Sequence, residues 1–196
     1  MTFQRSAPVA RNRGLAVPAA STWQNPGGAV VTIRPTRPDD ACIAQQFVRE
    51  LSPQARYYRF MGAVRELTPL MLRRFVRIDH VCEVALVAVA TQAGRTRQLG
   101  ECRYALRPGG DDCEFAIAVL DEWQKRGVGQ RLMSNLIGIA RTRGLSAMIG
   151  DVIATNAAML GLALKLGFRV GPSSEGLSIR RVSLPLLPAS CPDREH

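Results

Sequence analysis

The feature that most constrains the fold is a glycine-bearing turn between an apolar strand and a long amphipathic helix. Residues 113–120, CEFAIAVL, have the length and the largely apolar character of a strand. Beyond residue 122 the apolar period changes to about 3.6, as in a helix that Gly144 ends, with apolar residues at Val128, Leu132, Leu136 and Ile139. The segment between them reads Gln124-Lys-Arg-Gly-Val-Gly129. This order of elements places unpaired backbone N–H groups and the positive end of the helix dipole at one spot.

This turn is predicted to bind phosphate oxygens. Gly127 and Gly129 have no Cβ, so the backbone of the turn can approach an anion closely. The pattern is not a Walker loop, because Gly-Lys-Ser/Thr is missing. It is not a dinucleotide fingerprint either, because Leu132 or Met133 stands where the third glycine would be.

The other periodic segments predict an α+β domain, an α/β arrangement of three layers. Apolar runs bounded by turn residues predict strands at 30–34, 83–90, 99–106, 113–120 and 145–153, with a closing hairpin of 168–170 and 178–184. Helical spacing and caps, among them Asp39-Asp40, predict helices over 41–51, after Ser52-Pro53 and Thr68-Pro69, over 128–143 and over 156–166. Short turns join the strands from 83 to 120 into an antiparallel meander. We therefore expect a mixed, mostly antiparallel sheet with helices on its faces.

Composition sets the boundaries of this domain. The chain has 196 residues, 46% of them apolar, which is enough for one globular core. Residues 1–28 are rich in Pro and Gly and contain no acidic residue, so we expect a flexible basic arm there. The domain then covers 29–186, and 187–196 form a tail. No apolar run approaches the roughly 18 residues of a membrane span, and the N-terminus lacks the apolar region of a signal peptide. We expect a cytoplasmic protein with no membrane contact.

Charge and cysteine content exclude little by themselves. The formal net charge is +10, and almost all the cations are Arg, which reflects base composition more often than a choice of partner. A nucleic-acid partner is therefore not favoured, although the basic arm leaves that alternative open. The five cysteines show no C-x-x-C spacing, so we predict no zinc or other metal site and no disulfide framework. They are expected to be reduced thiols, mostly in the core.

Beyond these patterns, the chain resembles the GNAT superfamily of N-acetyltransferases. Gln124, Gly127 and Gly129 match its pyrophosphate loop, Gln/Arg-x-x-Gly-x-Gly/Ala, and Asn156 with Leu166-Gly167-Phe168 matches its second conserved helix. The similarity runs from about Val30 to about Leu184. Within the superfamily, 34–40, 51–60, Glu114-Phe-Ala-Ile and Asp121-Glu-Trp-Gln are similar to the acetyltransferase domain of bacterial protein lysine acetyltransferases.

The resemblance implies acyl-CoA, most simply acetyl-CoA, as the donor and co-substrate. It would lie in a V-shaped gap where the strand 113–120 separates from the strand 145–153. Backbone groups near Ile117 and Val119 would hold the pantetheine arm, with Asn156 beside it. The pyrophosphate would lie on the amides of the turn, at Gln124, Lys125, Arg126, Gly127, Val128, Gly129 and Gln130. Arg126 and Arg131 would either neutralise further phosphate charge or remain solvated.

Glu114 is the candidate general base. A primary amine with a pKa near 10.4 must lose a proton before it attacks a thioester. Glu114 is the only ionisable residue between Cys113 and Leu120, and it shares a strand face with the small residues Ala116 and Ala118. We expect burial to raise its pKa, and the resemblance implies the same role through a water molecule. The alternative is a solvated glutamate at the start of a strand.

The remaining chemistry needs no covalent intermediate. A backbone N–H near Val119 would stabilise the oxyanion, and the CoA thiolate would then leave. Alternation turns Cys113 to the other face, which favours a packed thiol over a nucleophile. Many relatives protonate the thiolate with a Tyr four residues before the glycine of the Gly-Phe pair, but this position is Ala163. The general acid is therefore supplied from elsewhere or is dispensable.

The predicted function is transfer of an acetyl group from acetyl-CoA to a primary amine. A protein lysine is the favoured acceptor, and a small-molecule amine is the alternative. Acidic residues around the strand would attract such a cation, or would simply be polar turn residues: Asp111, Asp112, Glu114, Asp121 and Glu122. A non-catalytic acyl-CoA-binding regulatory module is a further alternative, consistent with Ala163. We expect a monomer or a dimer.

Overall fold

The computed structural model describes residues 20–24, 27–92, 94–109 and 111–187. Within them, eight strands form one sheet in the order β1-β2-β3-β4-β5-β6-β8-β7. Every neighbouring pair is antiparallel except β5 and β6, which are parallel. The strands are β1 (Ser21–Gln24), β2 (Val30–Pro35), β3 (Glu83–Gln92), β4 (Arg95–Leu106), β5 (Cys113–Val119), β6 (Ala147–Ile153), β7 (Arg169–Pro172) and β8 (Ile179–Pro185). The predicted meander and closing hairpin are confirmed.

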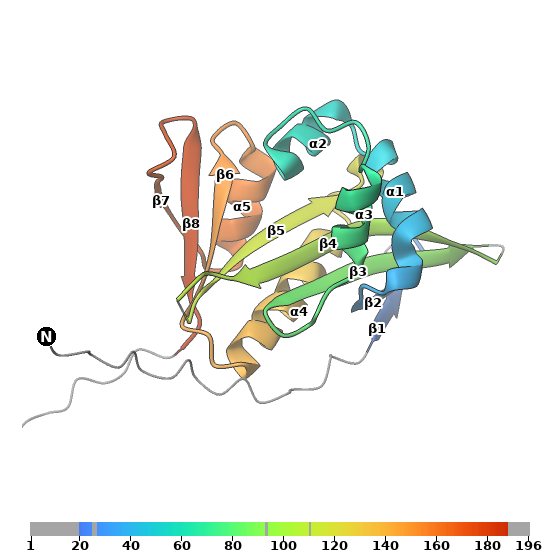
Figure 1. Cartoon of the computed structure of the whole chain (residues 1–196), viewed down its shortest axis with the longest axis horizontal. Coiled ribbons are helices and arrows are strands. Elements are labelled where there is room, and N and C mark those ends of the chain that lie inside the picture. Colours follow the sequence, from blue (N-terminus) through green and yellow to red (C-terminus); the bar gives the residue numbers. More distant parts are fainter. Residues whose placement is uncertain (1–19, 25–26, 93, 110, 188–196) are drawn as a thin grey trace, which may run out of the picture.

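Helices cover both faces of this sheet, as Figure 1 shows. One face carries α1 (Ala41–Glu50), α2 (Pro53–Phe60) and α3 (Pro69–Val76), and the other carries α4 (Val128–Thr142) and α5 (Ala157–Lys165). Short 3-10 turns, η1 (Pro38–Asp40) and η2 (Asp121–Trp123), precede α1 and the glycine turn. The predicted three-layer arrangement is confirmed.

Each layer has its own apolar core. The larger core joins the sheet to α4 through fully buried side chains such as Leu132, Leu136 and Met148. The smaller core joins it to α1 and α3 through Phe47, Val48 and Phe75. Alternation along β5 supplies both cores, because Phe115 packs in the larger one and Ala118 in the smaller one. The strand therefore presents a different set of side chains to each face.

The helix ends follow the sequence closely, with one exception. The Ser52 and Thr68 hydroxyls accept hydrogen bonds from the Ala55 and Met71 amides, as the Ser/Thr-Pro pattern predicts. Asp40 instead turns its carboxylate away from α1 and binds the Arg34 guanidinium at 2.6 and 2.8 Å. A charge-assisted pair is stronger than a neutral cap, so the predicted side-chain cap of α1 is wrong.

The arm predicted over 1–28 is partly ordered structure. Ser21–Gln24 form β1, which pairs with β2 at the edge of the sheet, and Trp23 packs against the larger core. Residues 1–19, 25–26 and the tail from 188 onward lie outside the described residues. Cys102 and Cys113 are buried, whereas Cys42 and Cys82 are exposed, so only half of the described cysteines lie in the core. None of the described helices is long and apolar enough to span a bilayer.

The parallel strands β5 and β6 pair with each other over only a few residues. The register pairs only Cys113 with Met148 and Glu114 with Ile149. Beyond these residues the two strands diverge, and α2 lies above their open ends (Figure 1). The predicted splayed gap is therefore present. Beyond the two paired residues, the facing edges of β5 and β6 carry backbone N–H and C=O groups that no other described strand pairs with.

Candidate active site

A cavity of about 1390 Å³ occupies the gap between β5 and β6. It connects the two faces of the sheet, because α2 lines one side of it and the glycine turn with α5 lines the other. Gln124, Lys125, Arg126, Gly127, Gly129 and Gln130 all line it, as do Glu114, Ile117, Val119 and Asn156. The predicted site residues therefore lie around one cavity, with Val128 as the exception. Its side chain is fully buried in the larger core, and the residue does not line the cavity.

The turn before α4 has the backbone shape that the glycines predict. Gly127 is the N-cap of α4 with φ of 85°, a left-handed value that suits glycine, and Lys125 also has a positive φ of 57°. Among the described residues no side chain caps this helix end, which leaves its first N–H groups free of a capping partner beside the cavity. Gly129 lies close to Ile117, Val119 and Leu162, at 3.4 to 3.8 Å from the position of an added Cβ. The turn is therefore tightly packed against β5 and α5, with the positive end of the α4 dipole at the cavity wall.

The backbone of β5 opens toward the gap at Val119. The next amide, that of Leu120, donates to the Leu99 carbonyl on β4 at 2.9 Å. Because successive backbone groups of a strand point to opposite sides, the Val119 N–H points away from β4 and toward β6. The Val119 carbonyl accepts a bond from Gln124 Nε2 at 3.3 Å, which ties the strand end to the turn.

Asn156 serves first as a helix cap. Its Oδ1 accepts a hydrogen bond from the Met159 amide at 3.1 Å and so starts α5 beside the cavity. The preceding residue, Thr155, is bound by Tyr58 of α2, whose hydroxyl lies 3.2 Å from the Thr155 carbonyl and 3.3 Å from its hydroxyl. Tyr58 thus bridges the two diverging sides of the gap. Sequence analysis gave no role to this tyrosine.

Two arginines beside the turn are held over indole rings. The Arg126 guanidinium lies 5.5 Å from the Trp123 ring, and that of Arg131 lies 4.9 Å from the Trp23 ring. Such cation–π contacts restrict exposed arginines to one side of the turn. Trp23 and Gln24 also line the cavity. The expectation of a flexible arm over 1–28 does not place these two residues at the cavity. Trp23, followed by a Pro-Gly-Gly turn and the strand at 30–34, is nevertheless a signal for a β-hairpin.

Glu114 is exposed, so its predicted burial is wrong. The strands separate immediately beyond it. Its position is nevertheless distinctive, because the other two carboxylates that line the cavity are paired. Asp121 accepts from Ser52 at 2.9 and 3.1 Å, and Asp151 accepts from Arg181 at 2.6 and 3.0 Å. Glu114 has no such partner among the described residues.

Asp151 was absent from the predicted site and lies across the gap from β5. Hydrogen bonds from Arg181 hold its pKa below the ordinary value, against the opposing effect of partial burial, and Ser173 adds a further bond. Its side chain is on the face of Ile149, which pairs with Glu114. Glu114 also attracts Arg181 at longer range. The acceptor side of the cavity is thus lined by the unpaired Glu114 carboxylate and by Asp151, which is paired with Arg181.

The other acidic residues do not form one cluster. Each has a different partner: Asp111 binds Ser146, Asp112 binds Arg107, and Glu122 binds Arg97. Cys113 faces the larger core, where burial raises its pKa to about 12, so it is a packed thiol as predicted. Ala163 is fully buried.

Comparison with known proteins identifies this arrangement. The model of the acetyltransferase (GNAT) family matches residues 66–168, from α3 to the end of α5. Acetyltransferase PA5475 of Pseudomonas aeruginosa is 37% identical over 141 residues, which are 72% of this chain and 76% of that protein. The family match covers β5, the glycine turn, β6 and α5.

Solved structures share the whole architecture. The GNAT domain of S. lividans PAT superposes with a TM-score of 0.77 at 26% identity, covering 87% of this chain and 99% of that one. YncA from Salmonella typhimurium, a structure with its cofactor acetyl-CoA, gives a TM-score of 0.65 at 20% identity, covering 84% and 98%. The eight-stranded sheet with its divergent β5–β6 pair is thus the GNAT fold. The chain belongs to the GNAT family and is an N-acetyltransferase.

Proposed function

We propose that the chain acetylates the side-chain amine of a protein lysine, with Glu114 as the general base. The donor would approach from the face of α4 and α5, where the glycine turn lies. The acceptor would approach from the face of α1 to α3, toward which Glu114, Ala116 and Ala118 point. The observation that carries the proposal is the unpaired Glu114 carboxylate on the cavity wall, where β5 and β6 separate.

The donor would be held largely by backbone groups. The amides from Gln124 to Gln130 would bind the pyrophosphate, with the dipole of α4 adding to the attraction. Ile117 and Val119 would bind the pantetheine arm along the open edge of β5, and Asn156 would flank it. Arg126 and Arg131 would compensate further phosphate charge. This mode of binding fixes the thioester at the end of β5, within reach of both faces.

The reaction would then be a direct transfer. Glu114 accepts a proton from the ammonium group, through water because the carboxylate is exposed, and the free amine attacks the thioester carbonyl. The Val119 N–H donates to the oxyanion that develops. Collapse of this intermediate breaks the carbon–sulfur bond, and CoA leaves as a thiolate that takes its proton from solvent. Buried Ala163 supplies no acid, and a thiol with a pKa of about 8.5 needs none.

A lysine side chain as acceptor is supported by charge. Among the cavity-lining carboxylates of the described chain, Asp151 is paired with Arg181, whereas Asp121 is bonded only to the neutral Ser52 and Glu114 has no hydrogen bond or ion pair. Net negative charge therefore faces the acceptor and would attract an ammonium group. The resemblance of 51–60 and of 114–117 to bacterial protein lysine acetyltransferases favours a lysine on a polypeptide over a small amine.

The test is release of free thiol from acetyl-CoA in the presence of an end-blocked lysine peptide. We expect Glu114→Gln to lower kcat by about 10²- to 10⁴-fold, the usual value of a general base, with CoA affinity unchanged by calorimetry. Glu122→Gln is the matched control, since Glu122 is an exposed glutamate paired with Arg97. Wild-type activity in Glu114→Gln would exclude it as the base. Activity on free amines but not on the peptide would assign a small-molecule acceptor.

A further inference from the structure

The helix that covers the acceptor side of the cavity has an unusual attachment. α2 lines the cavity with Gln54, Ala55, Tyr58, Arg59 and Phe60, yet none of its residues is buried. A helix of eight residues is too short to be stable alone in water. Ala55 and Phe60 pack against the smaller core but are only partly buried, so the position of α2 over the gap must also depend on specific polar contacts.

Those contacts are polar and come from four directions. Ser52, the N-cap, binds Asp121 at the end of β5. Arg56 donates to three carbonyls at the end of α1, among them Leu51 at 2.6 Å. Tyr58 binds Thr155 beyond β6, and Arg59 binds Glu101 on β4. The last of these is the only one made to a charged group inside the core.

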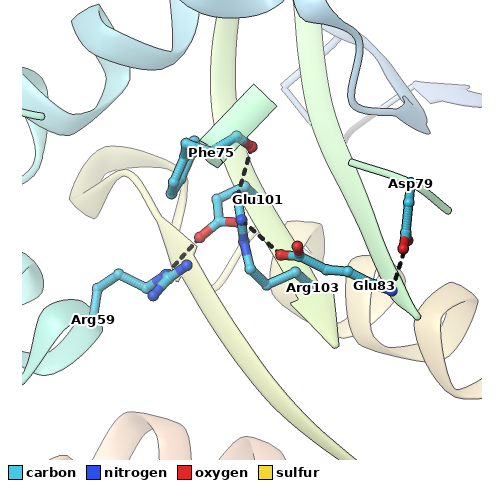
Figure 2. Close-up of polar contacts among 6 residues, drawn as sticks. All are labelled: Arg59, Phe75, Asp79, Glu83, Glu101 and Arg103. Carbon is cyan, nitrogen blue, oxygen red and sulfur yellow. Dashed lines mark hydrogen bonds and ion pairs between the residues drawn. The ribbon is translucent and has the colours of Figure 1, made fainter. Parts of the chain in front are cut away.

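Glu101 is the centre of a buried network, shown in Figure 2. Its side chain is 1% exposed and accepts from Arg59 Nε at 2.5 Å and from Arg103 Nε at 3.2 Å. Arg103 continues to Glu83 at 3.1 Å and to the Phe75 carbonyl at 3.1 Å. Both guanidinium groups lie over the Phe75 ring, at 5.7 Å for Arg59 and 4.0 Å for Arg103. Two arginines and two glutamates thus join α2, α3, β3 and β4 with balanced charge.

Glu101 is not placed to act on a substrate. It does not line the cavity, and both of its oxygens are occupied. Burial alone would raise its pKa, but the charges of Arg59 and Arg103 outweigh burial and hold the pKa below the ordinary value. Because the Glu101 carboxylate stays charged and both of its oxygens accept hydrogen bonds, it holds Arg59 and Arg103 in place. Arg59 is the part of the network that reaches the cavity wall.

The network also lies beside the acceptor path. Glu101 is directly opposite Ala118 on β5, and Arg103 is opposite Ala116. Directly opposite residues of an antiparallel pair share a face, so the anchor is on the side from which the acceptor would reach Glu114. A shift of α2 would change the width of this opening and break the bridge from Tyr58 to Thr155. The donor turn, on the other face, would be unaffected.

We propose that Arg59 and Glu101 form a positioning pair for the acceptor site, holding α2 over the gap so that the acceptor amine is directed toward Glu114. The inference rests on the proposed function for the identity of the site. A planar, stacking guanidinium suits this role better than an ammonium group, because its Nε edge binds Glu101 while its face packs on Phe60 and Phe75.

The experiment compares Arg59→Met, which keeps the length of the side chain, with wild type in the full chain. The readouts are steady-state kinetics with acetyl-CoA and the end-blocked lysine peptide, and hydrogen exchange of the α2 amides. We expect the KM for the peptide to rise about tenfold to a hundredfold, as a small misplacement does, while the Kd for CoA changes less than about twofold. Exchange should accelerate in α2 and remain slow in α4. Arg59→Lys should recover part of the peptide KM.

Arg49→Met is the matched control, since Arg49 lies on α1 and forms an exposed pair with Glu66. A purely structural role for Arg59 would lower kcat through loss of folded protein and leave both KM values unchanged, which would overturn the inference. Unchanged peptide KM with unchanged exchange in α2 would also overturn it. If Arg59→Met does not fold, Tyr58→Phe removes another anchor of α2 without disturbing the buried charges, and the same shifts are expected. Failure of CoA binding in the wild type would instead reject the proposed function, and the exchange data would still decide the role of Arg59.

Discussion

At the scale of single residues, the site depends on backbone conformation as much as on side chains. Gly127 shows this most directly, because a Cβ at this position would meet no atom within 4 Å. The requirement for glycine is therefore conformational and arises from φ of 85° at the N-cap of α4. The same residue fixes the direction of the N–H groups that would bind the pyrophosphate.

Replacement of Gly127 by alanine separates these effects. We expect Gly127→Ala to lower the free energy of unfolding by about 1–2 kcal/mol, the cost of a left-handed L-residue, and to weaken CoA binding measured by calorimetry. Gly138 is the control, because it is inside α4 with open space at its Cβ position. Gly138→Ala should raise stability by about 0.5–1 kcal/mol and leave CoA binding unchanged. Equal effects of the two substitutions would contradict the conformational explanation.

At the scale of elements, the cavity exists because two strands are joined at one end and tied to other neighbours elsewhere. β5 pairs along its whole length with β4, and β6 pairs along its whole length with β8. Between β5 and β6 only two residue pairs remain. The Asp151–Arg181 ion pair links β6 to β8, so β6 is held to the neighbour that lies on the side away from β5.

The stability given by Asp151 should depend on pH. Its pKa in the folded state is lowered by Arg181, so the pair contributes above the ordinary carboxyl pKa and is lost as the pH falls through the lowered value. We expect Asp151→Asn to cost about 1–3 kcal/mol near neutral pH, and this difference to shrink as the pH falls below about 4. Urea unfolding at a series of pH values measures it.

Asp112→Asn provides the comparison, because Asp112 pairs with the exposed Arg107. This change should alter stability by less than about 1 kcal/mol, as for most surface pairs. A loss for Asp151→Asn that stays the same from neutral to acidic pH would show that packing, and not the charge of the pair, stabilises β6.

In the molecule as a whole, a bound donor would contact elements of both apolar cores, which lie on opposite faces of the sheet. The cavity is lined by α2, β5, β6, α5 and the glycine turn, which belong to both cores. A ligand that binds only the folded state stabilises it by an amount that rises with the logarithm of its free concentration over Kd. CoA should therefore stabilise both cores as one unit.

A thermal shift measures this linkage. At CoA concentrations of about 100 times Kd, we expect about 2.7 kcal/mol of added stability, or a rise in Tm of roughly 5–10 °C for a domain of this size. Pantetheine, which lacks the phosphates, should give a much smaller rise at the same concentration. An equal effect of the two compounds would show that the turn at 124–130 contributes little to donor binding.

Most of the local structure was predictable from sequence because it depends on short-range rules. Apolar alternation predicts the meander, Ser52 and Thr68 cap their helices, and Gly144 ends α4, each through contacts within a few residues. The glycine turn was predictable for the same reason, since a strand, two glycines and a helix define its geometry. The edge strand β1 was not, because its four residues gain stability only by pairing with β2 and packing Trp23.

Local patterns were enough to predict the order of helices and strands from β2 onward, the glycine turn and the strand face of Glu114. The exposure of Glu114, the pairing of Asp151 with Arg181 and the anchoring of α2 through Arg59 and Glu101 emerged only from the packed fold. The difference is one of distance along the chain. Periodicity and caps act between residues close in the chain, whereas Arg59 and Glu101 are 42 residues apart and Tyr58 and Thr155 are 97 apart. Such pairs form only after the sheet has brought their elements together, and burial follows from that packing.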